Sequence, residues 1–389
     1  MPLPTIVHLD ADAFFVAVEQ ARRPELRGTK CAVGGRERGI ISSASYEARA
    51  CGVYTPMPTQ SALRVCPDLI LIPHTPGVYG EASRKMFDLC ETLTPIVQRN
   101  SIDEGYLDVG PCGFKTAAEV ETAVRGLQAR ILRELGLTVS MGIAANQLTA
   151  QIASKLRKPR GFVVVPPGTE ETFLAPLSVG KLPGIGSKTE ALLVAAGVRT
   201  VRDLVEAPAA RLQPILGSGV EECRAMARGI DDRPVETEHE DAKSYGQQQT
   251  FGTNLSDFEE VERIAKGMVD ELMPAIRKDG KRVRTMTVRV RYPDFSHESH
   301  GRSLAEATDL EQPFYPVVSE LLRAAWRKRL PLRLVGVKFS GVEEKPAQLE
   351  IFAETNEKRR RLAGVVDALN SRKDGPAVRP AGQLRKKPD

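Results

Sequence analysis

Apolar and polar residues follow two clear periodicities in the C-terminal half of the chain. Residues 284–292 alternate between the two types, which predicts a strand with a core face and a basic face that carries Arg289 and Arg291. Residues 256–279 place apolar side chains three or four positions apart, which predicts an amphipathic helix capped by Ser256. The same reasoning predicts two further elements of a small α+β domain, a helix over 313–329 and a strand over 332–341.

The N-terminal half begins with a short apolar strand that ends in acidic residues. Asp10 stands at the end of the strand, and Asp12 follows two positions later on the same face by strand periodicity. A carboxylate in apolar surroundings is costly unless it is paired or holds a metal ion. Capping of the helix that follows is an equally simple role for either residue taken alone.

A second acidic pair lies near a predicted bend. Residues 96–98 and 106–109 read as strands, and Asp103 and Glu104 lie between them. Adjacent strand residues face opposite sides, so both carboxylates reach one site only where the chain twists or bulges. Converging carboxylates repel one another unless a divalent cation lies between them, and Mg²⁺ prefers such oxygen ligands. The sequence supplies these ligand types for phosphoryl transfer, while their convergence depends on the fold.

Two segments carry side chains suited to phosphate. Tyr46 and Arg49 are three residues apart on one helical face, and Ser43 adds a hydroxyl donor. A later helix, capped by Asn146, is predicted to stop at Lys158 before a proline. Basic residues crowd the end of this helix, namely Lys155, Arg157, Lys158 and Arg160. Complementarity to the helix dipole is a sufficient explanation for that crowding.

Residues 178–204 have the pattern of two helices joined by a glycine turn. Gly184 and Gly186 let the backbone come close to a phosphate, and the next helix, with Lys188 near its start, offers free N–H groups. This arrangement contacts the DNA backbone without reading its sequence.

Composition bounds the molecule without identifying it. A chain of 389 residues predicts two to four domains, and 41 % hydrophobic with 27 % charged residues is ordinary globular composition. No apolar run approaches the roughly 18–20 residues needed to cross a bilayer. Six scattered cysteines, none in a Cys-x-x-Cys pair, argue against a zinc site and fit a reducing cytoplasm.

Charge is divided unevenly along the chain. Residues 231–273 carry 4 Lys and Arg against 12 Asp and Glu, whereas residues 274–345 carry 15 against 9. The basic block suits a polyanionic partner, although a solvated charged face explains it equally well. Residues 231–246 read as an extended linker, a further boundary is expected near 163–171, and the tail after residue 345 is expected to fray.

Taken in order, these motifs resemble the Y-family translesion DNA polymerases, specifically the bacterial DNA polymerase IV (DinB) group. The matching segments are HLDADAFFVAVE, ASYEAR, SIDEGYLD, GIAANQLTAQIASKLRKPRG and LPGIG, followed by the basic domain. The resemblance implies an α+β, multidomain right-hand polymerase fold. Its implied parts are a palm (1–20 and 77–166), small fingers (21–76), a helical thumb with the helix-hairpin-helix (167–232), a linker (233–244), an α+β little finger (245–345) and a C-terminal tail (346–389).

The resemblance also implies roles for individual residues. Those that would hold two Mg²⁺ ions are Asp10, Asp103, Glu104 and the Ala11 carbonyl, whereas Asp12 would be structural. Phe15 would be the steric gate that excludes a 2′-OH. The triphosphate would be held by Ser43, Tyr46, Arg49 and Lys158. The sequence departs from relatives at Gln151, where they commonly carry Lys, which puts one basic contribution to the site in doubt.

A short peptide follows the last predicted strand. The sequence QLEIF resembles the peptide by which such polymerases dock in the sliding clamp, with contacts from Gln348, Leu349, Ile351 and Phe352. A short edge strand of the last domain is the alternative.

We therefore expect a monomeric, cytoplasmic enzyme that binds primer–template DNA and dNTPs and does not associate with membranes. Its activity would be low-fidelity, template-directed DNA synthesis by two-metal-ion phosphoryl transfer, without proofreading. A non-catalytic relative that binds DNA and clamp is one alternative, but it would be expected to lack the three acids. A palm-type nucleotide cyclase is another, but it has no need of LPGIG or of a basic C-terminal domain.

Overall fold

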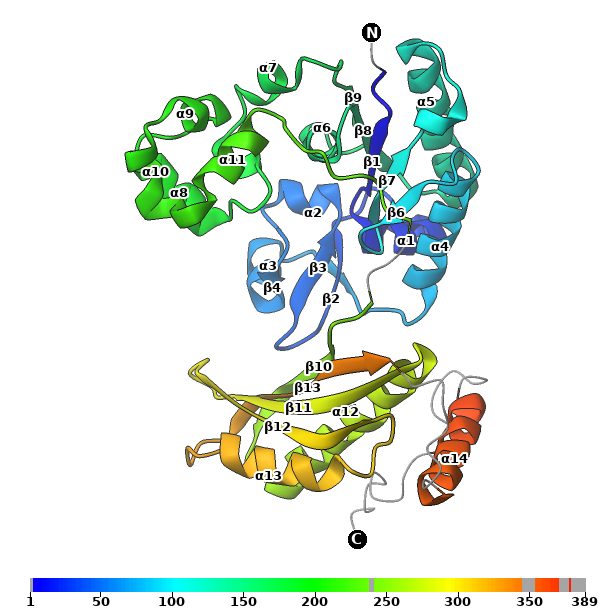
Figure 1. The fold of residues 1–389 in the computed structure, drawn as a ribbon, viewed down its shortest axis with the longest axis vertical. Helices are drawn as coiled ribbons and strands as arrows, with labels where there is room; N and C mark the ends of the chain where they lie inside the picture. Colours follow the sequence, from blue (N-terminus) through cyan, green and yellow to red (C-terminus); the bar gives the residue numbers. More distant parts are fainter. Residues whose placement is uncertain (1–2, 238–240, 345–353, 371–377, 379–389) are drawn as a thin grey trace. The chain divides into compact units, whose positions relative to one another are not determined.

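The computed structural model describes residues 3–237, 241–344, 354–370 and 378. The chain divides into two compact units, Met1–His239 and Glu240–Asp389 (Figure 1), and each is described by itself. The boundary falls within the stretch, residues 231–246, that the sequence identifies as a linker. Within the described part of the chain, no helix combines the length and apolar character that crossing a membrane requires.

The first unit is built on a five-stranded sheet with the order β6-β7-β1-β8-β9. The central strand β1 pairs antiparallel with both β7 and β8, whereas β8 and β9 run parallel. The strands are β1 (Ile6–Ala11), β6 (Val97–Arg99), β7 (Glu104–Asp108), β8 (Val139–Ala144) and β9 (Phe162–Val164). The two segments predicted as strands around the acidic bend are thus confirmed, to within one or two residues.

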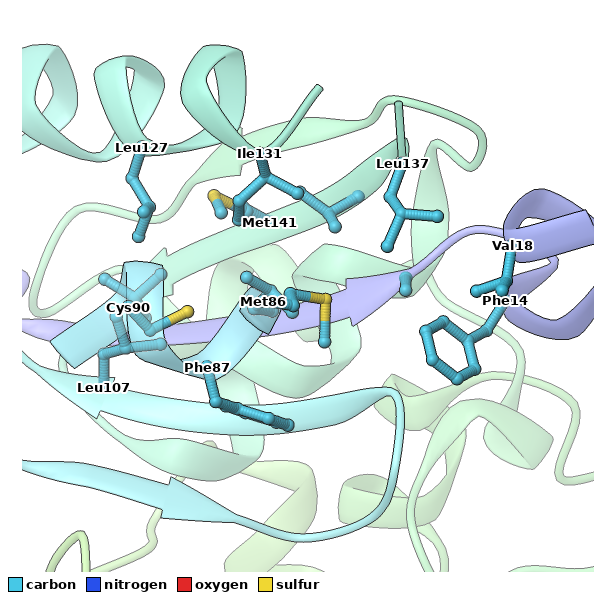
Figure 2. Packing of buried hydrophobic residues seen from close by; sticks show 14 of the residues in the cluster. Phe14, Val18, Met86, Phe87, Cys90, Leu107, Leu127, Ile131, Leu137 and Met141 are labelled. Carbon is cyan, nitrogen blue, oxygen red and sulfur yellow. The ribbon is translucent and has the colours of Figure 1, made fainter. Parts of the chain in front are cut away.

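The two faces of this sheet carry different residues. Odd-numbered positions of β1, such as Val7 and Leu9, enter an apolar core with three helices, namely α1 (Phe14–Arg22), α4 (Val78–Glu91) and α5 (Ala117–Leu135). Figure 2 shows this packing, with Phe14 and Val18 of α1 near Met86 and Phe87 of α4, and with Leu127 and Ile131 of α5 above the sheet. Even-numbered positions, His8 and Asp10, therefore point to the other face, which α6 (Gln147–Leu156) covers.

A second sheet and a helical region complete the first unit. The sheet has the order β4-β3-β2-β5 and lies within the segment expected to form the fingers. Its elements are β2 (Cys31–Gly34), β3 (Ile40–Ala44), α2 (Tyr46–Ala50), β4 (Met57–Pro58), α3 (Thr59–Val65) and β5 (Ile70–Ile72). The segment expected to form the thumb has a core of its own and comprises α7 (Glu170–Leu174), α8 (Ser187–Ala195), α9 (Val201–Glu206), α10 (Ala209–Leu216) and α11 (Val220–Ala227). Short 3₁₀ turns lie between successive elements of this unit, at Pro24–Leu26, Gly110–Cys112, Val179–Lys181 and Gly217–Gly219.

The second unit is a four-stranded antiparallel sheet with helices packed on one face. The strand order is β10-β13-β11-β12. Its elements are β10 (Tyr245–Leu255), α12 (Phe258–Lys278), β11 (Lys281–Arg291), β12 (His297–Thr308), α13 (Tyr315–Ala325), β13 (Leu332–Glu344) and α14 (Glu354–Asn370). The predicted alternation along β11 is confirmed, because Met286, Val288 and Val290 are buried while the residues between them are partly exposed.

Three local expectations are wrong in detail. Asp257 rather than Ser256 caps α12, since its carboxylate accepts hydrogen bonds from the N–H groups of Glu259 (2.8 Å) and Glu260 (3.4 Å). A carboxylate also complements the helix dipole, which a hydroxyl does not. The helix capped by Asn146 ends at Leu156, not at Lys158, because the residue before a proline is disfavoured in the α conformation.

The third wrong expectation is that the tail after residue 345 frays. Residues 354–370 instead form α14, which is ion-paired to the little-finger segment. The Arg277 guanidinium donates to both carboxylate oxygens of Asp367 at 2.7 and 2.9 Å, and Arg360 donates to the buried Asp309 at 3.0 Å. These paired charges hold the helix although its mean hydropathy is low.

Candidate active site

Strand pairing brings two of the three candidate acids together. In the β1–β7 ladder, Asp10 and Glu104 are direct partners across the strands. Immediately beyond the ladder, the Ala11 N–H donates to the Asp103 carbonyl at 2.9 Å. Paired residues on one face of an antiparallel sheet have Cβ atoms about 5 Å apart. The backbone therefore places the 103–104 bend beside the end of β1, as the sequence analysis requires.

Two lysines lie against these carboxylates, Lys155 in the last turn of α6 and Lys158 two residues beyond the helix. The ammonium group of Lys158 contacts Asp10 Oδ1, and it lies 3.9 Å from Asp12 Oδ1. The ammonium group of Lys155 lies 3.0 Å from Glu104 Oε2 and 3.9 Å from Asp10 Oδ2. Each of the two facing carboxylates thus has an ammonium group of its own.

The position of α6 follows from local sequence. Asn146 caps the helix by accepting a hydrogen bond from the Thr149 N–H, as predicted. Gly142 on β8 lets the helix lie close to the strand, because a Cβ atom there would stand 2.2 Å from the Ala150 carbonyl oxygen and 2.6 Å from the Ser154 nitrogen. This close approach of α6 to β8 is what allows Lys155 and Lys158, which follow in the chain, to reach the acids of β1 and β7.

Asp12 belongs to the framework of the site. Its buried carboxylate accepts hydrogen bonds from the Ser140 hydroxyl and from the Arg160 N–H, both at 2.8 Å. It thereby fixes the turn after Lys158 to strand β8. These contacts agree with the structural role expected for this acid.

His8 lies beneath the acids on the same face of β1. Its Nδ1 is 2.7 Å from the Ser154 hydroxyl, and its ring packs edge-on against Tyr106. Its buried Nε2 is 3.9 Å from Glu104 Oε2 and has no hydrogen-bond partner among the described residues. Burial, together with the charges of Lys155 and Lys158, lowers the pKa of His8 to about 3, so the ring is neutral at physiological pH.

The electrostatics of Asp10 combine opposing effects. Burial raises the pKa of Asp10, and the nearby charge of Glu104 acts in the same direction. The ammonium groups of Lys158 and Lys155 lower it. The negative charges of Asp10 and Glu104 therefore need positive charge nearby, and in this structure Lys155 and Lys158 provide it.

The donor chemistry suits a hard divalent cation, because carboxylate oxygens are the ligands that Mg²⁺ prefers. Among the residues that the structure describes, however, no group of three or more His, Cys, Asp or Glu side chains is arranged to hold a metal ion. The Asp103 carboxylate accepts a hydrogen bond from the Ser101 hydroxyl at 2.6 Å. The oxygen donors and the negative charge of these acids therefore fit a magnesium site. In this structure, however, the carboxylates of Asp10, Asp103 and Glu104 are not arranged around one point.

Three of the four candidate phosphate ligands, Ser43, Tyr46 and Arg49, lie on β3 and α2, whereas Lys158 contacts Asp10. The Arg49 guanidinium stacks on the Tyr46 ring at 4.8 Å, which confirms that the two share a helical face. The buried Tyr46 hydroxyl has no hydrogen-bond partner in the described part of the chain, and burial, with the charges of Asp12 and Asp10, raises the pKa of Tyr46 to about 12. Ser43 is buried, and its hydroxyl faces the Val16 N–H at 3.5 Å.

The candidate steric gate is held by aromatic contacts. The Phe15 ring packs edge-on against Tyr79 (4.8 Å between centroids) and His74 (5.4 Å). Tyr79 is fixed in turn by a hydrogen bond of 2.8 Å to the buried Glu19 carboxylate, which also accepts from Thr75. Such a ring has little freedom to move away from a ligand.

The candidate DNA contacts lie elsewhere. Gly184 adopts φ +84°, Gly186 precedes α8, and Lys188 is exposed in the first turn of that helix. In the second unit, a groove of about 650 Å³ on the open sheet face is lined by Arg289, with polar and basic residues of the other strands. Arg291 follows two positions later, and the Nε atoms of both arginines lack hydrogen-bond partners among the described residues. The QLEIF peptide (348–352) lies outside the described residues.

Two residues beside the acids, Lys155 and His8, are not among the site residues that the sequence predicts. Lys155 is one of several basic residues in its segment, and nothing in the sequence assigns a role to His8. A signal was present in both cases. His8 is two residues from Asp10 on one strand, so the two share a face, and Lys155 is only three residues before Lys158 in the same basic cluster.

Comparison with known proteins gives the family. Residues 9–155 match the impB/mucB/samB family, residues 242–351 match its C-terminal domain, and residues 167–198 match the IMS family HHH motif. The DNA polymerase IV of Opitutus terrae is 68 % identical over 389 residues, which cover 100 % of this chain and 99 % of that protein. The chain belongs to the DNA polymerase IV (DinB) group of the Y family. It is a DNA-directed DNA polymerase of the translesion type, and its family uses divalent metal ions.

Other relatives and solved structures agree with this assignment. The DNA polymerase IV of Alkalilimnicola ehrlichii is 38 % identical over 89 % of this chain and 99 % of its own. A Y-family polymerase chimera of Dbh and Dpo4 matches with a TM-score of 0.79 at 27 % identity, over 87 % of this chain and 99 % of that one. An insertion ternary complex of Dbh DNA polymerase matches with a TM-score of 0.62 at 28 % identity, over the same shares. The predicted α+β right-hand polymerase fold is confirmed.

Proposed function

We propose that this polymerase performs nucleotidyl transfer at the Asp10–Glu104 pair. Asp10, Asp103 and Glu104, with the Ala11 carbonyl, would hold two Mg²⁺ ions. When bound, these ions neutralise the triphosphate and favour attack by the primer 3′-oxygen. The observation that carries the proposal is the direct pairing of Asp10 with Glu104 beside the Asp103–Ala11 hydrogen bond.

The chain's own residues would bind and orient the incoming dNTP. The stacked Tyr46 and Arg49 offer a hydroxyl and a guanidinium to the triphosphate, and Lys158 offers an ammonium group. The buried Ser43 hydroxyl would be a further donor. The fixed ring of Phe15 would lie under the sugar and leave no room for a 2′-OH. The orphaned hydroxyl of Tyr46 supports this arrangement, because a buried polar group without a partner is costly unless a ligand satisfies it.

Primer–template DNA would be held through its phosphates. Gly184, Gly186 and Lys188 at the start of α8 suit one contact, and Arg289 and Arg291 on the open sheet face suit another. The unpaired Nε donors of the two arginines support the second. We also propose that Gln348, Leu349, Ile351 and Phe352 bind the sliding clamp, that the protein is a monomer, and that it acts in the bacterial cytoplasm.

Primer extension by Asp103→Ala tests the metal site. Loss of a carboxylate ligand is expected to lower the extension rate by about 10³-fold or more while leaving primer–template affinity within about twofold. Asp108→Ala is the matched control, since it removes a carboxylate from the far end of β7, the strand that Asp103 immediately precedes, where Asp108 pairs with Ile6. Extension by the Asp103 variant at the rate of this control would refute the assignment.

A further inference from the structure

Lys155 has a position that the proposed nucleotidyl transfer does not explain. It stands in the last turn of α6, and 43 % of its side chain is exposed. Its ammonium group nonetheless turns back to the sheet, 3.0 Å from Glu104 Oε2 and 3.9 Å from Asp10 Oδ2. Complementarity to a helix dipole requires only that a cation be near the helix end, so it does not account for a bridge between these two acids.

The turn that carries Lys155 is anchored to β1. The hydroxyl of the buried Ser154 donates to the Gln151 carbonyl at 2.8 Å, so its oxygen is free to accept from His8 Nδ1 at 2.7 Å. This contact ties the backbone next to Lys155 to the residue two positions before Asp10. It also leaves His8 Nε2 directed toward Glu104 Oε2 at 3.9 Å, with no hydrogen-bond partner among the described residues.

The residue one turn before Lys155 carries no charge. Gln151 lies four residues before Lys155, on the same face of α6, and it is neutral. Because Gln151 brings no charge to the site, the cation nearest to Glu104 in the described structure is Lys155.

We propose that Lys155 is a positioning residue that serves as the resident counter-ion of Glu104. In the metal-free protein, Lys155 holds the Glu104 carboxylate toward Asp10. When a divalent cation binds to these carboxylates, the Lys155 ammonium group moves away from Glu104. This inference rests on the proposed metal site. An ammonium group and a divalent cation that share one carboxylate oxygen repel each other. At a separation of about 4–5 Å, this repulsion disfavours metal binding by more free energy than is gained because the Glu104 side chain is already ordered. Lys155 therefore weakens metal binding before substrate arrives.

Direct binding of Mn²⁺ to the full-length protein without DNA or nucleotide tests the proposal. Electron paramagnetic resonance counts the free ion, so no catalytic activity is needed for the readout. Lys155→Gln is expected to bind Mn²⁺ about three- to tenfold more tightly, since partial exposure screens the repulsion. Lys155→Arg should restore the wild-type affinity. Arg157→Gln is the matched control, because it removes an exposed charge from the same helix end and no contact of Arg157 with either acid is seen.

A double-mutant cycle separates this role from the metal site itself. In a Glu104→Gln background the Lys155→Gln change should lose its effect, because the shared carboxylate is gone. Unchanged or weaker Mn²⁺ binding by Lys155→Gln, while binding still depends on Glu104, would overturn the role of Lys155 alone. Mn²⁺ binding that is insensitive to both Asp10→Asn and Glu104→Gln would overturn the proposed metal site and this inference together.

Discussion

Residue Asp10 is only 7 % exposed, and it pairs with Glu104 across the ladder. Burial raises the pKa of Asp10, whereas the ammonium groups of Lys158 and Lys155 stabilise its charged form. A site with this balance has a strong affinity for positive charge, which a nucleotide arriving with its metal ions can supply. In the proposed reaction, the metal ions would therefore take over the charge compensation that the two lysines provide in this structure.

Phe15 gives a prediction at the level of one side chain. Phe15→Ala removes a ring that Tyr79 and His74 hold in place, so a nucleotide with a 2′-OH should fit. We expect ribonucleotide incorporation to rise by at least about tenfold, which corresponds to roughly 1.4 kcal/mol of relieved repulsion. Single-nucleotide insertion with matched ribo- and deoxyribonucleotides measures it.

Deoxynucleotide insertion by the same variant is the internal control, and it should change much less. An unchanged ratio of ribo- to deoxyribonucleotide insertion would remove Phe15 from the role of gate.

At the scale of elements, the distance between α6 and β8 decides whether the lysines reach the acids. Gly142→Ala places a Cβ atom 2.2 Å from a backbone oxygen of the helix, so the helix must shift. We expect the variant to lose about 1–3 kcal/mol of stability through overpacking and to lose polymerase activity as well. Denaturant unfolding and primer extension measure the two effects.

Gly126→Ala is a suitable control because Gly126 lies exposed in α5 and an added Cβ atom would meet nothing within 4 Å. It should gain about 0.5–1 kcal/mol from helix propensity. Equal stability of the Gly142 variant and the wild type would show that the two elements need not lie so close.

Elements with local signals could be predicted, and elements that depend on pairing could not. The cap at Asn146 and the alternation along β11 were predicted because each is encoded in a few adjacent residues. Strands β10 (Tyr245–Leu255) and β12 (His297–Thr308) were missed, because both are largely exposed and lack an apolar alternation. They form by hydrogen bonding to β13 and β11, which the sequence does not display.

The candidate site shows the same division. Motif residues such as Asp10 and Glu104 could be found from the sequence, and their pairing became visible only through the register of β1 with β7. The bridge from Lys155 depends on the close packing of α6 that Gly142 allows, which no single segment reveals.

For the whole molecule, the basic block over residues 274–345 predicts DNA binding that depends on salt. If Arg289 and Arg291 each contact a phosphate, the double change to Gln should reduce the slope of log affinity against log salt by about 2. Fluorescence anisotropy of labelled primer–template at several salt concentrations measures this slope. Lys278→Gln, on the helix that packs against the opposite face of the sheet, should leave it unchanged, and equal slopes for all variants would contradict the contact.

The most direct test of the account is to locate the metal ions. Anomalous diffraction from a crystal of the full-length protein with chain-terminated primer–template, the matching dNTP and Mn²⁺ would do so. We predict two Mn²⁺ peaks bound by carboxylate oxygens of Asp10, Asp103 and Glu104, with the Lys155 ammonium group moved away from Glu104. Mn²⁺ peaks that lie away from these three acids, with Asp10 still bound to Lys158, would contradict the central claim.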